Sequence, residues 1–147
     1  ESHAMLDYLD SLVPPERRMF PVAEPARHRA IRVAALATGL GDKAVSLFYE
    51  KRLHAQTSPV WVDRCRAQIL AVLAVLEAER AERPTPYWFG ERIGHADIAV
   101  AAVLRFLGEA HPDVARLAEY PALAAHAARL EALPAFQAVQ QPFLPPA

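Results

Sequence analysis

The sequence contains a single cysteine, Cys65, and only five glycines among its 147 residues. One cysteine excludes an intrachain disulfide and fits a reducing compartment. The few glycines contrast with abundant alanine, the residue that loses least on entering a helix. No segment sustains the alternation of apolar and polar residues that a half-buried strand requires. We therefore predict an all-α chain, and the 53% of apolar residues exclude a disordered one.

Charge of one sign and long apolar runs are also scarce. The formal net charge is −1, and no block of Lys or Arg provides the basic surface that nucleic acid requires. The longest unbroken apolar run, 69–76, is far shorter than the roughly 20 residues that span a bilayer. No signal peptide is visible, although the first residue is not Met. We expect no nucleic-acid partner, no membrane partner and a cytoplasmic location.

Prolines and apolar periodicity divide the chain into helices. The patterns predict helices over 2–12, 26–53, 59–83, 95–110 and 121–133, a short helical turn at 134–136, and a non-helical tail at 142–147. Residues 16–25 form a proline-containing linker without helical period. Gly39 and Gly41 fall inside the longest predicted helix and cost about 1 kcal/mol each relative to Ala, so we expect a bend or a close contact there.

A capping motif opens the predicted helix 95–110. Asp97 stands at the third helical position, where its carboxylate can accept a hydrogen bond from the backbone N–H of Gly94. Ile93 and Ile98 have the spacing of a hydrophobic staple. This segment resembles the capping box that opens the buried central helix in the C-terminal domain of glutathione S-transferases. The family usually has Ser or Thr at the position of Gly94, and Gly loses one side-chain acceptor, costing a few tenths of a kcal/mol.

Three further segments resemble the same family, in the family's order. Tyr87-Trp88-Phe89-Gly90 is similar to the aromatic turn before the capping box, and 120–136 is similar to the closing helices. Residues 1–9 resemble the start of the last helix of the thioredoxin-like domain. The resemblance implies that 1–15 is this last helix, 16–25 a linker, and 26–147 the all-helical domain of about five to six helices.

The resemblance implies that Glu1 and Ser2 bind glutathione. Free backbone N–H groups and the positive dipole end of a helix N-terminus suit the γ-glutamyl carboxylate. The Ser2 hydroxyl can donate to this carboxylate, and Glu1 can meet the α-ammonium group. The alternative interpretation is that Ser2 is only a helix cap.

The long helix of the family lines the pocket for the electrophile and faces the partner subunit. Thr38, Gly41, Val45 and Phe48 have spacings of three, four and three, so they share one face of the predicted helix. The resemblance implies that this face forms the electrophile pocket. The alternative for any one of these residues is an ordinary core position. Many relatives have an Asp near Thr38, so a cross-subunit contact to glutathione is weakened here.

The resemblance implies an enzyme that conjugates glutathione, as co-substrate, to small hydrophobic electrophiles, and that forms a homodimer. The family's catalytic Tyr, Ser or Cys would lie upstream of Glu1, so we predict no catalytic residue within this chain. The six histidines lack metal-ligand spacing, and no metal site is expected. Two alternatives remain open: a glutathione-dependent reductase, isomerase or dehalogenase, and a non-catalytic binding module with the same fold.

Overall fold

The computed structural model describes residues 2–145, and within that range it contains helices and no β-strand. The α-helices are α1 (Ser2–Ser11), α2 (Ala26–Leu53), α3 (Pro59–Ala81), α4 (His95–Ala110), α5 (Pro121–Glu131) and α6 (Pro134–Val139), with 3-10 turns η1 (Pro15–Arg17) and η2 (Leu117–Glu119). The predicted all-α class is confirmed. α2 and α4 begin and end at the predicted residues, whereas α6 continues past the predicted turn.

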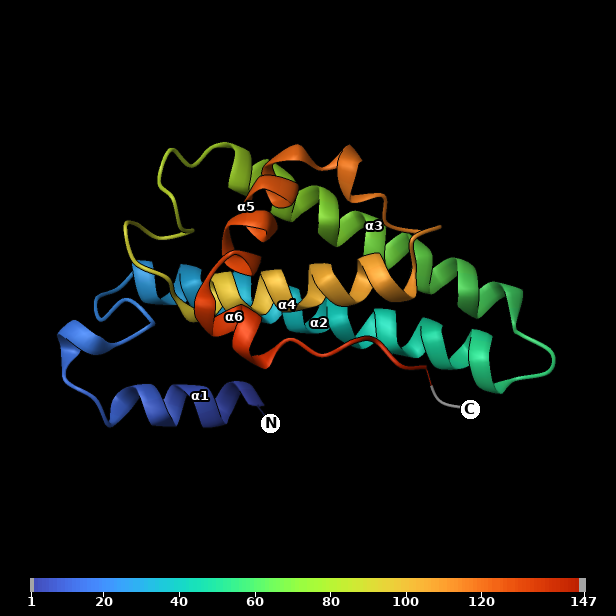
Figure 1. Cartoon of the computed structure of the whole chain (residues 1–147), viewed down its shortest axis with the longest axis horizontal. Coiled ribbons are helices and arrows are strands. Elements are labelled where there is room, and N and C mark those ends of the chain that lie inside the picture. Colours follow the sequence, from blue (N-terminus) through green and yellow to red (C-terminus); the bar gives the residue numbers. More distant parts are fainter. Residues whose placement is uncertain (1, 146–147) are drawn as a thin grey trace.

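The core lies where α2 packs against both α3 and α4, and α5 closes it by packing against α3 and α4 (Figure 1). Apolar side chains from all of these helices, and Trp88 from the turn between α3 and α4, are fully buried there. The largest of them are Leu40, Leu47, Ile69, Leu73, Leu76, Trp88, Leu107, Leu123 and Leu130. None of the helices within residues 2–145 is long and apolar enough to cross a membrane.

The two glycines of α2 have different surroundings. A Cβ added at Gly41 would lie 3.2 Å from Cγ2 of Val103, so the small residue lets α2 approach α4 closely. A Cβ at Gly39 would meet nothing within 4 Å, because Gly39 borders an open groove between α2 and α3. The expected close contact therefore exists at Gly41 alone.

Helix α5 obtains its N-terminal cap from a distant side chain. The backbone N–H groups of Ala122 and Leu123 donate to the two carboxylate oxygens of Glu77 on α3, each at 2.9 Å. Tyr120, the residue at the N-cap position, makes no side-chain cap of its own. Glu77 therefore satisfies N–H groups that otherwise lack an intrahelical partner, and it fastens α5 to α3.

Candidate functional site

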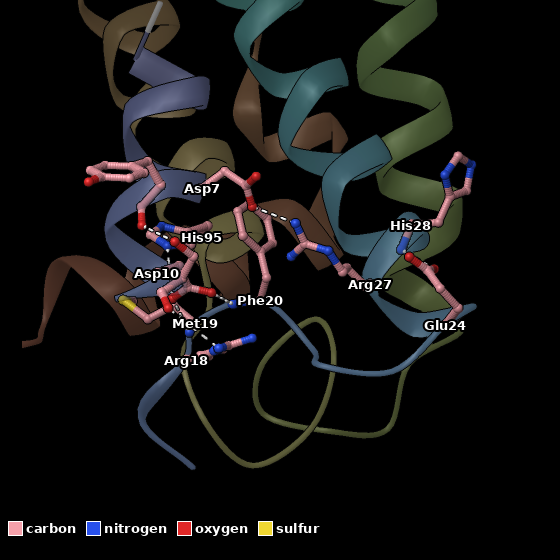
Figure 2. Close-up of polar contacts among 11 residues, drawn as sticks. Asp7, Asp10, Arg18, Met19, Phe20, Glu24, Arg27, His28 and His95 are labelled. Carbon is pink, nitrogen blue, oxygen red and sulfur yellow. Dashed lines mark hydrogen bonds and ion pairs between the residues drawn. The ribbon is translucent and has the colours of Figure 1, made fainter. Parts of the chain in front are cut away.

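The junction between α1 and the helical core is built around one buried carboxylate. Asp10, near the end of α1, accepts hydrogen bonds from the backbone N–H groups of Met19 and Phe20 at 2.6 and 3.0 Å (Figure 2). Its Oδ1 atom also lies 3.5 Å from Nε2 of His95, the first residue of α4. Asp10 is therefore the residue that ties α1, the linker and α4 together.

Aromatic and ionic contacts complete this junction. The His95 ring packs on the Phe20 ring with 4.5 Å between centroids, and the Arg27 guanidinium carbon lies 5.6 Å from the centroid of the same Phe20 ring. Arg27 also pairs with Asp7 of α1 at 2.5 Å. Burial lowers the pKa of His95, although the neighbouring Asp10 acts in the opposite direction. His95 is buried.

The predicted glutathione-binding residues lie at the free end of α1. Ser2 is exposed and is the first residue of this ten-residue helix, so the unpaired N–H groups of the first turn are close to its side chain. Glu1 lies outside the described residues. The predicted glutathione site at Glu1 and Ser2 therefore remains a proposal.

α1 contacts the core through its polar side and leaves its apolar side uncovered. Asp10 is the one buried residue of the helix among those described. The large apolar side chains of α1, and Leu12 directly after it, are 41–65% exposed: Met5, Leu6, Tyr8, Leu9 and Leu12. A contiguous apolar face of this kind indicates a surface that another protein element covers.

The predicted electrophile face lies along α2. Thr38 is exposed, and its hydroxyl donates to the carbonyl oxygen of Ala35 one turn earlier, at 3.1 Å. Val45 is 39% exposed, while Gly41 and Phe48 are half-buried. None of the four is fully buried. Their role in an electrophile pocket stays a prediction.

Phe48 belongs to an aromatic cluster that the sequence did not reveal. Its ring lies 6.4 Å from the Phe106 ring on α4 and 5.4 Å from the Phe143 ring in the C-terminal tail. Phe106 and Phe143 also contact each other at 5.6 Å. The only sequence signal was one aromatic residue within a proline-rich tail. The tail therefore covers one end of the predicted electrophile face.

The carboxylate of Asp97 organises the start of α4. Its Oδ2 accepts from the N–H of Gly94 at 2.8 Å, and its Oδ1 accepts from the N–H of Trp88 at 2.7 Å. His126 of α5 approaches Oδ1 with Nε2 at 3.4 Å. Burial raises the pKa of Asp97, and these hydrogen bonds limit the rise. The carboxylate thus joins the 84–90 turn, α4 and α5, and it faces the protein interior.

Gly94 makes close approach to the linker possible. A Cβ at this position would lie 2.7 Å from the carbonyl oxygen of Met19, nearer than real Cβ atoms are found. The N–H of the next residue, His95, donates to the same carbonyl at 3.3 Å.

Because Gly has no side-chain acceptor, Asp97 supplies the only side-chain cap of α4 in the described chain. In the aromatic turn, Gly90 has a φ of 139°, which favours glycine.

Cys65 and the histidines provide no further reactive centre. Cys65 is completely buried, and burial raises the pKa of its thiol, so it is an inert core residue. Among residues 2–145, no three His, Cys, Asp or Glu side chains are grouped in a way that would hold a metal ion.

Comparisons with known proteins agree on one family. Residues 59–129 match the model of the glutathione S-transferase C-terminal domain. No curated protein sequence matches the chain. A glutathione transferase family member from Pseudomonas fluorescens Pf-5, solved with bound glutathione, is 35% identical with a TM-score of 0.84, and the match covers 97% of this chain and 68% of that one.

Two other solved structures are similar. A glutathione S-transferase from Methylobacterium radiotolerans, in complex with glutathione sulfonate, is 28% identical with a TM-score of 0.85, covering 100% of this chain and 70% of that one. A glutathione S-transferase from Methylobacillus flagellatus KT with bound glutathione is 24% identical with a TM-score of 0.84, covering 94% and 67%, and shows the fold alone. The helices, their capping motif and these matches together establish that the chain belongs to the glutathione S-transferase family.

Proposed function

We propose that this protein conjugates glutathione to small hydrophobic electrophiles and that the chain described here supplies the electrophile pocket. The observation that carries the proposal is the match over 97% of the chain to a family member that binds glutathione. Fold alone does not fix a reaction. The support from this chain's own residues is the exposed Ser2 at a helix N-terminus, together with the partly exposed face of α2.

In the proposed site, the γ-glutamyl carboxylate of glutathione accepts hydrogen bonds from the Ser2 hydroxyl and from the free N–H groups of α1. Glu1 pairs with the α-ammonium group. The glutathione thiolate attacks the electrophilic carbon, a carbon–sulfur bond forms, and the leaving group departs with the bonding electrons. A hydroxyl donor outside this chain stabilises the thiolate, because the thiolate is the nucleophile.

The uncovered face of α1 supports the proposed domain organisation. Tyr8, Leu9 and Leu12 are each more than half exposed, whereas Asp10 on the opposite side is buried against the linker. We infer that this apolar face packs inside a thioredoxin-like domain, of which residues 1–15 are the last helix. We further infer a cytoplasmic homodimer in which the exposed surface of α2 contacts the partner subunit.

Calorimetric titration of glutathione into the full-length protein tests the proposed site. We expect saturable binding, weakened about tenfold in Ser2→Ala because a charge-assisted hydrogen bond is lost. Ser11→Ala is the matched control, since Ser11 lies at the other end of the same helix and its hydroxyl donates only to the carbonyl of Tyr8. Equal affinities in both variants would remove Ser2 from the site.

A conjugation assay with an activated chloroaromatic compound tests the reaction. We expect formation of the thioether with release of chloride. Binding without conjugation would favour the glutathione-dependent reductase, isomerase or dehalogenase, or the non-catalytic binding module. Absence of binding in a folded protein would leave the family membership standing and contradict the proposed function.

A further inference from the structure

A cleft between α3 and α5 is lined largely by basic side chains. Its volume is about 190 Å³, and its polar lining consists of Arg80, Arg83, His126 and Arg129, with Ala81, Ala122 and Ala125 between them. This is space for several water molecules, or for one tetrahedral oxyanion with ordered water. The cleft is separate from the α1 N-terminus and from the predicted electrophile face of α2.

Positive charge in the cleft exceeds the negative charge that faces it. Arg129 forms no hydrogen bond or ion pair with any of residues 2–145 that the structure describes, so its charge is uncompensated. Arg83 approaches Glu79 at 3.8 Å, but Glu79 is also bound by Arg32, and the buried Nε of Arg83 has no partner in the described chain. Two arginines therefore have unused hydrogen-bonding capacity beside the cleft.

Arg80 adds charge but is held in place by the protein. Its guanidinium donates to the backbone carbonyls of Arg83, Thr85 and Pro86 at 2.7–3.4 Å. Carbonyl oxygens satisfy its N–H groups without neutralising it. The carboxylate of Asp97 is the nearest buried negative group, and it is occupied by two backbone N–H groups.

Besides the excess of positive charge, the cleft contains an unpartnered buried side chain, that of His126. This residue is 1% exposed and lines the cleft, yet neither its Nδ1 nor its Nε2 has a hydrogen-bond partner in the described structure. Its Nε2 faces Oδ1 of Asp97 at 3.4 Å. A buried polar atom without a partner costs about 1–3 kcal/mol, so its retention calls for a partner that the chain does not provide.

The helix N-terminus nearby is not the source of the positive potential. The first N–H groups of α5, on Ala122 and Leu123, are already bound by Glu77. Attraction for an anion in this cleft therefore comes from the arginine and histidine side chains. Arginine suits this role because its planar N–H groups match two oxygens of a phosphate or sulfate group.

We propose that this cleft binds a small tetrahedral oxyanion, a phosphate or sulfate group, through Arg129, Arg83 Nε and protonated His126 Nδ1. The neutral His126 ring carries one N–H, and when this N–H is on Nε2, 3.4 Å from Oδ1 of Asp97, Nδ1 is a bare acceptor. A proton on Nδ1 turns it into a donor toward the anion. Binding is therefore linked to proton uptake by His126, and affinity rises as the pH falls. The other charged groups around the cleft are Arg80, Arg83 and Arg129, with the carboxylates Glu79 and Asp97.

Sulfate titration of the full chain tests the site, because sulfate keeps its charge between pH 6 and 8. Ionic strength is held constant with chloride, and side-chain NMR resonances of His126 and of the arginine Nε–H groups are followed. We expect saturable shifts, tighter binding at the lower pH, and an increased pKa of His126. Chemical shifts that change linearly with sulfate concentration and do not saturate would indicate only general ionic screening and would overturn the proposal.

Arg129→Gln is the informative variant, since Arg129 is exposed and we expect its replacement to leave the fold intact. We expect sulfate affinity to fall about tenfold or more. Arg64→Gln removes the same charge from an exposed position of α3 outside the cleft, and its affinity should stay within about twofold of the original. Equal losses in the two variants would show that only net charge matters and would contradict a built site.

A second arm identifies the source of the anion. Phenyl phosphate is compared with inorganic phosphate at the same pH. Tighter binding of the ester indicates that the cleft recognises a phosphate group carried on a larger molecule, and equal or weaker binding indicates a free ion. Failure of both to compete with sulfate would overturn the proposal. Glutathione affinity, measured in Arg129→Gln, should be unchanged, which separates this site from the proposed function.

Discussion

Asp10 and His95 meet where α1 joins the core, with 3.5 Å between Oδ1 of Asp10 and Nε2 of His95. The same carboxylate holds the backbone N–H groups of Met19 and Phe20. Because hydrogen bonds to a buried charged group contribute about 1.5–3 kcal/mol each, we expect Asp10→Ala to lower the free energy of unfolding by roughly 2–4 kcal/mol. Hydrogen exchange at the Met19 and Phe20 amides should accelerate.

Asp7→Ala is the control for this prediction. Asp7 also lies on α1 and also contacts the core, but its pair with Arg27 has partly exposed side chains on both sides. Such pairs contribute about 0–1 kcal/mol. Comparable losses of stability in the two variants would contradict the special role of Asp10.

Asp97→Ala should be more harmful than loss of an ordinary helix cap. An N-terminal cap contributes about 1 kcal/mol, but Asp97 also accepts from the Trp88 N–H and faces His126. We expect a loss of roughly 2–4 kcal/mol in chemical denaturation. Asp42→Ala, at an exposed position in the middle of α2, should change stability by less than about 0.5 kcal/mol. A melting temperature for Asp97→Ala equal to that of the control would contradict the capping role.

Gly94→Ser restores the residue type that the family usually has, and yet we expect it to destabilise this protein. The new Cβ would lie 2.7 Å from the Met19 carbonyl oxygen, so the linker or the start of α4 must move. The expected cost is about 1–3 kcal/mol, more than a new cap returns. Gly108→Ser, on the same helix where a Cβ meets nothing within 4 Å, should be neutral or stabilising. A gain of stability in Gly94→Ser would show that the linker yields easily.

Stability should fall between pH 6.5 and pH 4. Burial, together with Arg80 and Arg129, lowers the pKa of His126 from 6.5 to about 4. The unfolded chain therefore binds a proton in this window while the folded chain does not, so the folded state loses about 3 kcal/mol from His126 as the pH falls. The lowered pKa values of His95 and His111 act in the same direction, and the raised pKa of Asp97 acts against them.

Urea denaturation at pH 7 and pH 4 checks this prediction, compared between the original protein and His126→Gln, which cannot titrate. We expect a smaller loss of stability in the variant. His28→Gln, which removes an exposed histidine from the first turn of α2, is the control. Parallel pH profiles for all three proteins would show that His126 is protonated without cost in the folded state.

Helix positions were largely predictable because their signals are local. Pro59 after Ser58, Gly94 before Asp97, and the prolines at 121 and 134 mark helix starts through their own backbone restrictions, and the observed helices begin there. The family resemblance rested on the same local motifs, which is why the fold class was recoverable.

The contacts that position the helices were not predictable, because their partners are far apart in sequence. Glu77 reads as an ordinary charged residue of α3, and only the folded chain brings it to Ala122 and Leu123. In the sequence, Gly94 indicates only an incomplete helix cap. In the structure, its lack of a Cβ allows the Met19 carbonyl oxygen to lie close to the start of α4. The α2 face was located from its spacing, but its aromatic neighbours Phe106 and Phe143 depend on tertiary packing.

The Phe143 ring packs against the rings of Phe48 and Phe106, so this part of the tail occupies a surface that a ligand could otherwise contact. Any compound that binds against that side of Phe48 must first displace a benzyl group that the chain itself carries. Its apparent affinity is the intrinsic affinity reduced by the fraction of molecules in which the tail has left. A compound therefore binds there only when its contacts with Phe48 are stronger than those of the Phe143 side chain. The tail thus excludes weak ligands.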